Sequence, residues 1–460
     1  MRAHEAGALH ADFGQPPMWL RPPADVNALM KELWPKTATK DAEGVLHIGG
    51  VPVTRLAEEY GTPAYFLDEE DFRARCRSFR EAFAGSEVFY AGKAFLCKAV
   101  VRILAEEDLY LDVCTGGELA TALGAGMDPE RIGFHGNNKS VSELNRALDA
   151  GVGRIVLDSF AEIERLTELA RARGVRPKVL IRVTVGVEAH THEFIATAHE
   201  DQKFGFSLAG GEAFRAAQRV LAEDVLELRG LHSHIGSQIF DASGFELSAR
   251  RLLSLQQRVR DELGSELPEM DLGGGFGIAY TSQDDPQPAA DLAARMNKIV
   301  DDECAAAGLS RPRLSVEPGR ALIGPAIFTL YEVGTVKPMP GLRTYVSVDG
   351  GMSDNIRAAL YDASYSATLA SRASHEPPIL ARVVGKHCES GDVVVKDEFL
   401  PADVRPGDLL AVPGTGAYCR SMASNYNHVP RPPVVAVRDG QSRVIVRRET
   451  EDDLLALDVG

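Results

Sequence analysis

The sequence predicts a (β/α)8 barrel joined to an antiparallel β domain with the form of a sandwich or barrel. Three observations support this fold class. A strand, loop and helix pattern repeats between about residue 85 and residue 320, polar side chains gather at the strand ends, and short β-rich runs take over after about residue 326. A chain of 460 residues is also too long for one ordinary core, so we expect more than one domain.

Eight short runs rich in Val, Ile, Leu, Tyr or Phe are predicted to be the barrel strands. They are 88–91, 110–114, 132–136, 154–158, 178–183, 230–235, 270–274 and 314–317. Helical patterns lie between them, clearest over 98–106 and 160–170, where apolar residues recur at helical spacing. Eight such units in roughly 240 residues match a (β/α)8 barrel, whose active site lies at the carboxyl ends of its strands.

Polar residues lie at or just after most of these strand ends: Lys93, Asp112, His135, Asp158, Arg182, His234, Gly273 to Gly275 and Glu317. A charge inside a barrel must be paired or it costs a large desolvation energy, so core packing explains this pattern poorly. We therefore expect a functional site at this end. A doubly wound sheet with scattered polar residues is the alternative fold.

The second domain is predicted from β-rich runs separated by Gly, Pro and Asp. These runs are 344–348, 379–384, 409–412 and 434–437. The first 65 residues contain a Pro-rich start and one short helical stretch, and we expect them to complete the β domain. The predicted boundaries are 68–326 for the barrel, with 1–67 and 327–460 forming the β domain.

Composition limits the classes of function. The net charge of −16 disfavours nucleic acid as a partner, because an acidic surface repels phosphate backbones. The sequence has no run of apolar residues long enough for a membrane span, and 1–7 has no signal-peptide core, so we expect a cytoplasmic protein without membrane partners. The six cysteines show no CxxC pair and are expected to be thiols.

Lys93 and Glu317 together indicate a pyridoxal phosphate enzyme. A lysine amine holds an aldehyde cofactor as a Schiff base, and a carboxylate keeps a pyridine nitrogen protonated, so the two residues supply both ends of an electron sink. Taken singly, a lysine is usually a solvated surface charge and a Glu-Pro-Gly string is usually a turn. The case depends on the motifs between and after them.

Two motifs between them fit a phosphate-bearing cofactor. Gly273-Gly274-Gly275 follows the predicted seventh strand and would expose successive backbone amides, which suit a phosphate. His234 would stack on a flat cofactor and Ser237 would bind a phosphate oxygen. A tight turn is the plain alternative for the glycines.

A metal site is the alternative for the histidines. His232 and His234 lie on one strand face, His190 and His192 form a second such pair, and Asp112, His135 or Asp158 would complete a metallohydrolase site. A bound zinc ion would leave Lys93 and the glycine loop unexplained, so we predict no metal.

The chain resembles the diaminopimelate decarboxylases in a series of motifs that occur in order from Lys93 onward. These are 90–94, 232–238, 273–275, 317–320, 349–355, 388–392 and 416–418. The resemblance implies a pyridoxal 5'-phosphate enzyme of the alanine racemase-like class, with a barrel, a β domain and homodimers whose active sites are shared. It implies the substrate meso-diaminopimelate, the product L-lysine, and a place as the last step of lysine biosynthesis.

The resemblance also implies roles for individual residues. Lys93 would bind the cofactor aldehyde and Cys388, from the neighbouring subunit, would protonate the α-carbon. The cofactor would contact His234, Ser237, Gly275, Glu317, Pro318, Gly319, Arg320 and Tyr418, and the substrate would contact Arg320, Arg357, Tyr361, Glu389 and Tyr418. An arginine fork matches a carboxylate in a bidentate manner, so the arginines would select a substrate with a distal carboxylate.

Related activities give the rival predictions. A decarboxylase of ornithine, arginine or carboxynorspermidine would have no use for Arg320, Arg357 and Glu389 together, and an alanine racemase would need a second base on the opposite face. A pyridoxal phosphate carrier without activity would resemble the barrel alone. The loop 187–203, rich in His and Glu, is predicted to order on substrate binding.

Overall fold

The computed structural model describes residues 15–186 and 203–460. The chain divides into two compact units. One unit comprises 1–72, 278–285 and 323–460, and the other comprises 73–277 and 286–322. Within the described ranges, no helix combines the length and apolar character that crossing a membrane requires.

The second of these units is built on a closed parallel barrel, which confirms the predicted fold class. Its strands are β5 (Glu87–Ala91), β6 (Tyr110–Val113), β7 (Ile132–Phe134), β8 (Arg154–Leu157), β9 (Lys178–Thr184), β11 (Glu227–His232), β12 (Glu269–Asp271) and β13 (Arg313–Val316). Their order is β9-β11-β12-β13-β5-β6-β7-β8, and β8 pairs with β9 to close the ring. A two-residue strand, β10 (Phe206–Ser207), adds to β9. All eight predicted strands are present within a few residues.

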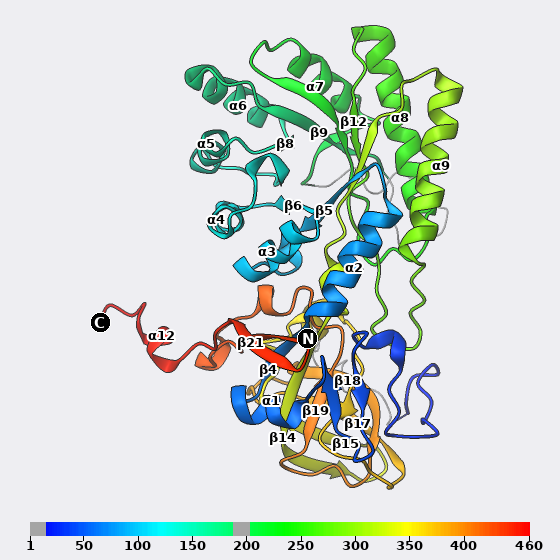
Figure 1. The fold of residues 1–460 in the computed structure, drawn as a ribbon, viewed down its shortest axis with the longest axis vertical. Helices are drawn as coiled ribbons and strands as arrows, with labels where there is room; N and C mark the ends of the chain where they lie inside the picture. Colours follow the sequence, from blue (N-terminus) through cyan, green and yellow to red (C-terminus); the bar gives the residue numbers. More distant parts are fainter. Residues whose placement is uncertain (1–14, 187–202) are drawn as a thin grey trace, which may run out of the picture. The chain divides into compact units, whose positions relative to one another are not determined.

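Helices alternate with the barrel strands and lie around them (Figure 1). They are α2 (Glu69–Ala82), α3 (Lys98–Glu106), α4 (Gly116–Ala125), α5 (Val141–Ala150), α6 (Phe160–Arg173), α7 (Glu212–Leu221), α8 (Ser243–Leu263), α9 (Ala289–Ala307) and α10 (Arg320–Ile323). Thr115, Ser140 and Ser159 cap three of them by accepting a backbone N–H, which satisfies an amide that the helix cannot. The predicted helices over 98–106 and 160–170 are confirmed.

The other unit is a mostly antiparallel β structure, as predicted. Its large sheet runs β18-β17-β15-β14-β4-β20-β21, with β19 beside β14 and β16 beside β19. The bounds are β4 (Ala64–Asp68), β14 (Ile327–Met339), β15 (Arg343–Val348), β16 (Thr368–Leu369), β17 (Pro378–Val384), β18 (Val393–Pro401), β19 (Leu409–Val412), β20 (Val434–Arg438) and β21 (Gln441–Val446). The pairs β15–β17 and β20–β4 are parallel.

The N-terminal segment contributes to this β unit. Strand β4 pairs with both β14 and β20. Three short strands form a separate sheet, and short helices complete the unit: β1 (Thr39–Lys40), β2 (Leu46–Ile48), β3 (Val51–Pro52), α1 (Val53–Tyr60), α11 (Arg357–Tyr361) and α12 (Glu451–Leu455). Leu33, Trp34, Leu46 and Ile48 are buried in one core with Phe328 of β14. The first strands of the chain are therefore part of the β unit's core.

Candidate active site

Buried polar side chains from five strands converge at the carboxyl end of the barrel. Glu317 and His135 directly follow β13 and β7, His232 and Asp271 end β11 and β12, and Asp112 lies in β6. Each of these residues is at most 6 % exposed. Five ionisable groups buried in one place are costly unless they have a use, which marks this end as the functional one.

Glu317 lies at the centre of this cluster. Its Oε1 is 3.1 Å from Nε2 of His232 and 3.2 Å from Nε2 of His135. Nε2 of His135 is also 3.7 Å from Oδ1 of Asp112. One carboxylate oxygen is thus approached by two imidazole rings from two different strands.

Burial shifts the pKa values of these groups toward their neutral forms. Burial and the charge of Glu317 raise the pKa of Asp271 to about 7, and the same two causes raise the pKa of Asp112 well above its ordinary value. Burial also raises the pKa of Glu317, which the positive charges of Lys93 and Arg182 partly offset. Burial lowers the pKa of His232 to about 4 and that of His135 well below its ordinary value.

Lys93 lies in a short 3-10 turn that directly follows β5. Its positive charge lowers the pKa values of Asp112, Glu317 and His234, so its ammonium group lies near the carboxyl cluster. A Cβ on the preceding Gly92 would meet the Asp112 carbonyl oxygen at 2.8 Å. The turn that presents Lys93 therefore requires a glycine at that position.

The glycine triplet packs against neighbouring backbone. A Cβ on Gly273 would lie 2.3 Å from the Ser233 carbonyl oxygen, and one on Gly274 would lie 2.3 Å from that of Glu317. Gly275 has φ of +108°, which glycine adopts far more readily than other residues. The missing side chains let β12 and its loop approach β11 and β13 closely. The glycines therefore have a structural role in addition to the predicted contact with phosphate.

His234 and Ser237 lie on the segment that follows β11. His234 is half-buried, and its Nδ1 accepts a hydrogen bond from the Gly274 amide at 3.2 Å. Burial and the charges of Lys93 and Arg182 lower the pKa of His234 well below its ordinary value. The exposed Ser237 hydroxyl accepts from the Arg320 guanidinium at 2.9 Å. The structure thus brings the predicted cofactor residues His234, Gly274, Ser237 and Arg320 into two contacting pairs.

Arg357 is a buried cation in the β unit. It begins α11, is 6 % exposed, and donates to the Tyr365 hydroxyl at 2.5 Å. Its guanidinium also lies 4.8 Å from the centre of the Tyr280 ring. Within 15–186 and 203–460 no carboxylate forms an ion pair with it. A buried guanidinium without a carboxylate partner suits binding of an anionic group.

Three further predicted residues of the β unit are exposed. Tyr361, Cys388 and Glu389 all present their side chains to solvent in the single chain. Tyr418 is half-buried and has φ of +62°, a left-handed conformation that is rare for a bulky residue. Such strain in a folded protein is often associated with a functional position.

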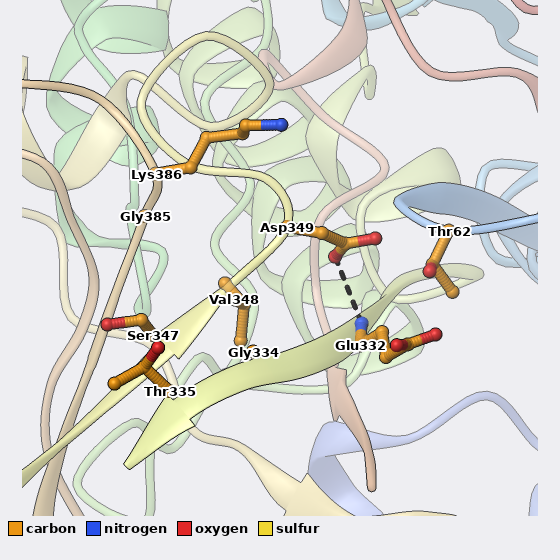
Figure 2. A pocket seen from close by; sticks show the side chains of 9 residues that line it. All are labelled: Thr62, Glu332, Gly334, Thr335, Ser347, Val348, Asp349, Gly385 and Lys386. Carbon is orange, nitrogen blue, oxygen red and sulfur yellow. Dashed lines mark hydrogen bonds between the residues drawn. The ribbon is translucent and has the colours of Figure 1, made fainter. Parts of the chain in front are cut away.

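A pocket of about 680 Å³ lies in the β unit, and none of the predicted site residues lines it. Figure 2 shows the side chains that do. The pocket is lined by Thr62, Glu332, Gly334, Thr335, Ser347, Val348, Asp349, Gly385 and Lys386. The Glu332 amide donates to Oδ1 of Asp349 at 3.0 Å, and burial raises the pKa of Asp349. Because Lys386 is two residues before Cys388 in the sequence, the pocket is a neighbour of the predicted proton donor along the chain.

The barrel end fits pyridoxal phosphate better than a metal ion. Ligand atoms of His135, His232 and Glu317 lie within 4.8 Å of one another, which a metal would accept. A metal would leave the Lys93 amine and the contacts of His234 without a use, whereas the cofactor needs an amine for its aldehyde and an anion for its pyridine nitrogen. His190, His192 and most of the predicted lid, 187–202, lie outside the described residues.

Sequence reasoning missed the contact of both histidines with one oxygen of Glu317. It also missed Lys139, which is 2 % exposed and donates to the Glu162 carboxylate at 2.6 Å, while the other Glu162 oxygen accepts from the Asp158 amide at 2.8 Å. A lysine three residues after the predicted strand over 132–136 was the available signal. Sequence alone does not show which way such a side chain turns.

Comparison with known proteins identifies the family. The model of the pyridoxal-dependent decarboxylase pyridoxal-binding domain matches residues 69–324. The diaminopimelate decarboxylase of Mycobacterium tuberculosis is 59% identical over 440 residues, covering 94% of this chain and 98% of that protein. The diaminopimelate decarboxylase of Bacillus subtilis is 47% identical over 427 residues, covering 92% and 97%.

A solved structure extends this similarity to the whole fold. The diaminopimelate decarboxylase of M. jannaschii, in co-complex with L-lysine, superposes with a TM-score of 0.87 at 32% identity, covering 93% of this chain and 98% of that one. Both units of the present chain are therefore included. The chain belongs to the diaminopimelate decarboxylase family of pyridoxal-dependent decarboxylases.

Proposed function

We propose that this chain converts meso-2,6-diaminopimelate to L-lysine and CO2 with pyridoxal 5'-phosphate as cofactor, as the last step of lysine biosynthesis. Its relatives of 47% to 59% identity carry the name of this activity over nearly their whole length. The structural observation that carries the proposal is Arg357, a buried guanidinium with no carboxylate partner in the described chain. The substrate has a second carboxylate to offer it.

The bound cofactor supplies an electron sink for the electron pair that CO2 leaves behind on the α-carbon. Lys93 would hold the cofactor through its aldehyde. Glu317 pairs with the pyridine nitrogen and keeps it protonated. The positive charges of Lys93 and Arg182, which oppose the effect of burial on the pKa of Glu317, favour the carboxylate form that this role requires.

The remaining cofactor contacts are assigned to residues on the same barrel end. His234 stacks on the ring, and its Nδ1 is held by the Gly274 amide, so its orientation is fixed before the cofactor binds. Ser237, Gly275, Pro318, Gly319 and Arg320 surround the phosphate. The hydrogen bond from the Arg320 guanidinium to the Ser237 hydroxyl keeps these two side chains together.

The substrate's distal end is assigned to residues that are far apart in the sequence. Arg320, Arg357 and Tyr361 bind the distal carboxylate, and Glu389 pairs with the distal ammonium. Tyr418, whose backbone is left-handed, contacts cofactor and substrate. An analogue without the distal carboxylate would leave the arginines unpaired, and a site built to bond a missing group rejects such an analogue by roughly 10⁴-fold.

Protonation of the α-carbon is assigned to Cys388 of the neighbouring subunit in a homodimer. After CO2 departs, the thiol gives its proton to the α-carbon, a C–H bond forms, and the thiolate regains a proton from solvent. A proton donor must act where bulk water is excluded, but Cys388, Glu389 and Tyr361 are exposed in the single chain. A second subunit that covers them removes this conflict.

The domain boundaries and the cellular location are also proposals. We assign 68–326 to the barrel domain, with 1–67 and 327–460 in the β domain. We also assign the protein to the cytoplasm, where its six free thiols would stay reduced. Cell fractionation with antibody detection checks the location, and recovery in a membrane or extracellular fraction would contradict it.

The test is an assay of L-lysine and CO2 from meso-diaminopimelate with purified, cofactor-loaded protein, compared with L-ornithine. We expect turnover of meso-diaminopimelate and at least roughly 10³-fold lower kcat/KM for ornithine. Arg357→Leu should raise KM for meso-diaminopimelate about 100-fold or more, because the distal carboxylate loses a bidentate partner.

The matched control is Arg431→Leu, which removes an arginine of the same unit that is paired with Glu449. It should leave KM unchanged. Equal turnover of ornithine by the wild-type protein would contradict the substrate assignment, and an unchanged KM in Arg357→Leu would contradict the assigned role of Arg357.

A further inference from the structure

Two buried histidines beside Glu317 have no role in the proposed function. His232 ends β11 and His135 follows β7. These two strands are not neighbours in the barrel: β12, β13, β5 and β6 lie between them in one direction around the ring, and β9 and β8 in the other. The two rings lie edge to face, with centres 4.9 Å apart. Their exposed fractions are 1 % and 6 %, so neither is a surface residue.

Both rings direct the same atom, Nε2, toward the same oxygen of Glu317. The distances to Oε1 are 3.1 Å from His232 and 3.2 Å from His135, within the range of an N–H···O hydrogen bond. His135 is shared, because its Nε2 also lies 3.7 Å from Asp112. In the described chain, Glu317 is the carboxylate that lies within 4.0 Å of a ring nitrogen of His232.

The angles at these contacts are not yet those of hydrogen bonds. In the described chain, Oε1 of Glu317 and both ring nitrogens of His232 are buried and have no aligned partner. A buried polar atom left in this state destabilises the protein, so a small rotation that aligns Nε2–H with Oε1 is favourable. Catalytic hydrogen bonds often align only when the ligand is bound.

We propose that His232 is a positioning residue for Glu317: it donates its Nε2 proton to Oε1 and so fixes the orientation of the carboxylate that pairs with the cofactor's pyridine nitrogen. This inference rests on the proposed role of Glu317. A neutral imidazole is suited to this task because it donates one hydrogen bond without adding a charge that would compete with the pyridinium for Glu317.

The surroundings of His232 favour that neutral, donating state. The charged groups that act on it are Asp271, Arg182, Lys93 and Asp158, and Glu317 and the neutral ring of His135 lie beside it. Burial and the two cations outweigh the carboxylates and lower its pKa. Nε2 of His135 lies near the same oxygen but also near Asp112. We therefore assign His135 a weaker effect than His232 on the orientation of Glu317.

The experiment compares His232→Leu, His232→Gln and the control His47→Leu in protein loaded with pyridoxal phosphate. His47 lies in the β unit and contacts Asp41, far along the chain from the barrel residues. We expect His232→Leu to lower kcat about 100-fold, as misplacement of a catalytic group does, with KM for meso-diaminopimelate within about 3-fold. His232→Gln keeps an N–H near the position of Nε2 and should recover most of the loss.

A second readout does not depend on turnover. The pH dependence of the visible absorbance of the bound cofactor, measured without substrate, reports protonation of the pyridine nitrogen. We expect it to move toward lower pH in His232→Leu, to return in His232→Gln, and to be unchanged in His47→Leu. An unaltered absorbance profile in His232→Leu would overturn the inference, even if kcat falls.

The remaining outcomes are also decisive. If His232→Leu fails to fold by circular dichroism, ¹⁵N spectra of histidine-labelled wild-type protein decide, since His232 protonated on Nδ1 instead of Nε2 would overturn the proposal. Stoichiometric zinc in the cofactor-loaded protein would also overturn it. If the wild-type protein binds the cofactor but does not release CO2 from meso-diaminopimelate, the proposed function fails while the absorbance result still tests His232.

Discussion

The two ends of the barrel both hold buried ionisable groups, but these groups have different partners. At the amino end, Glu87, Arg154, Glu269 and Arg313 each begin a strand, and every carboxylate has a guanidinium partner. At the carboxyl end, Glu317 lies among other carboxyl groups and neutral histidines without an aligned hydrogen bond to Oε1. Ion pairs within the protein neutralise the charges at the amino end, whereas the groups at the carboxyl end need a bound ligand to complete their interactions.

Arg154 is the centre of the amino-end network. Its Nε lies 2.5 Å from Oε2 of Glu269, and its Nη2 lies 3.4 Å from Oε2 of Glu87. Arg313 bridges the same two carboxylates at 3.1 and 2.9 Å, and Arg229 adds a third guanidinium to Glu269 at 3.1 Å. These contacts join strands that are far apart in sequence, so they stabilise the closed ring.

The difference shows how a barrel separates stability from chemistry. Charged groups that are paired within the protein stabilise the fold, and they have no free hydrogen-bonding positions for a ligand. Polar groups held in a buried, incompletely satisfied state raise the energy of the fold but supply binding and shifted pKa values. Changes at the two ends should therefore affect different measurements.

The largest effect is expected from Glu317→Gln at the carboxyl end. The amide cannot keep the pyridine nitrogen protonated, so kcat should fall about 10³-fold. The free energy of unfolding should not fall, because the substitution removes a buried ionisable group. Glu269→Gln, the matched change at the amino end, should lower stability and leave kcat unchanged, and the reverse pattern would contradict the division of roles.

Arg154→Ala should be the most damaging change to stability. It leaves Glu269 and Glu87 buried with fewer guanidinium partners, and breaking a buried ion pair costs roughly 3 to 5 kcal/mol. Denaturant unfolding followed by circular dichroism measures the loss, and kcat per folded molecule should stay within about 2-fold. A drop in kcat without a drop in stability would show that the network serves the reaction.

Acid should destabilise the carboxyl end through His232. Its pKa of about 4 in the folded protein lies below the ordinary value of 6.5, so the unfolded chain takes up a proton first as pH falls. The contribution of His232 to stability is complete above pH 6.5 and is lost as pH falls toward 4, by roughly 3 kcal/mol.

The measurement is the difference in unfolding free energy between the wild-type protein and His232→Gln across this range, both without cofactor. Taking the difference is necessary because Asp271, whose pKa is raised to about 7, changes stability in the opposite sense over the same range. A difference that does not vary with pH would show that His232 titrates normally in the folded protein.

The smallest effect is expected from Arg229→Ala. Its side chain is 31 % exposed, and Glu269 keeps Arg154 and Arg313. Partly exposed ion pairs contribute little, so the loss in unfolding free energy should be below about 1 kcal/mol. A loss as large as that of Arg154→Ala would mean that the network is cooperative and that its members cannot be ranked by burial.

The strands and the identity of the main site residues could be predicted from the sequence because their signals are local. Each strand is a short apolar run, and Lys93, His234 and Glu317 each lie at or just after the end of one, which places them at the same end of a barrel. The amino-end network had only a faint signal, namely a charged residue at the first position of several strands. Which carboxylate each arginine meets depends on strand order and on side-chain rotation, which the sequence does not contain.

The contact of His232 with Glu317 could not be predicted for a related reason. The alternation of His232 and His234 along one strand was visible, and it was compatible with either a metal or a cofactor. Only the closed order of the barrel brings His232 close to Glu317, which follows β13, and to His135, which follows β7. The short strands β1 to β3 were missed because two or three residues carry no clear alternation.

The most direct test of the central claim is the absorbance spectrum of protein reconstituted with pyridoxal phosphate, recorded for the wild type, Lys93→Ala and Arg154→Ala. Under the proposal that the carboxyl end holds the cofactor through Lys93, we expect a visible band of lysine-bound cofactor in the wild type and in folded Arg154→Ala, and its loss in Lys93→Ala. A band that persists in Lys93→Ala, or a wild-type protein that shows none, would contradict the assignment of chemistry to this end of the barrel.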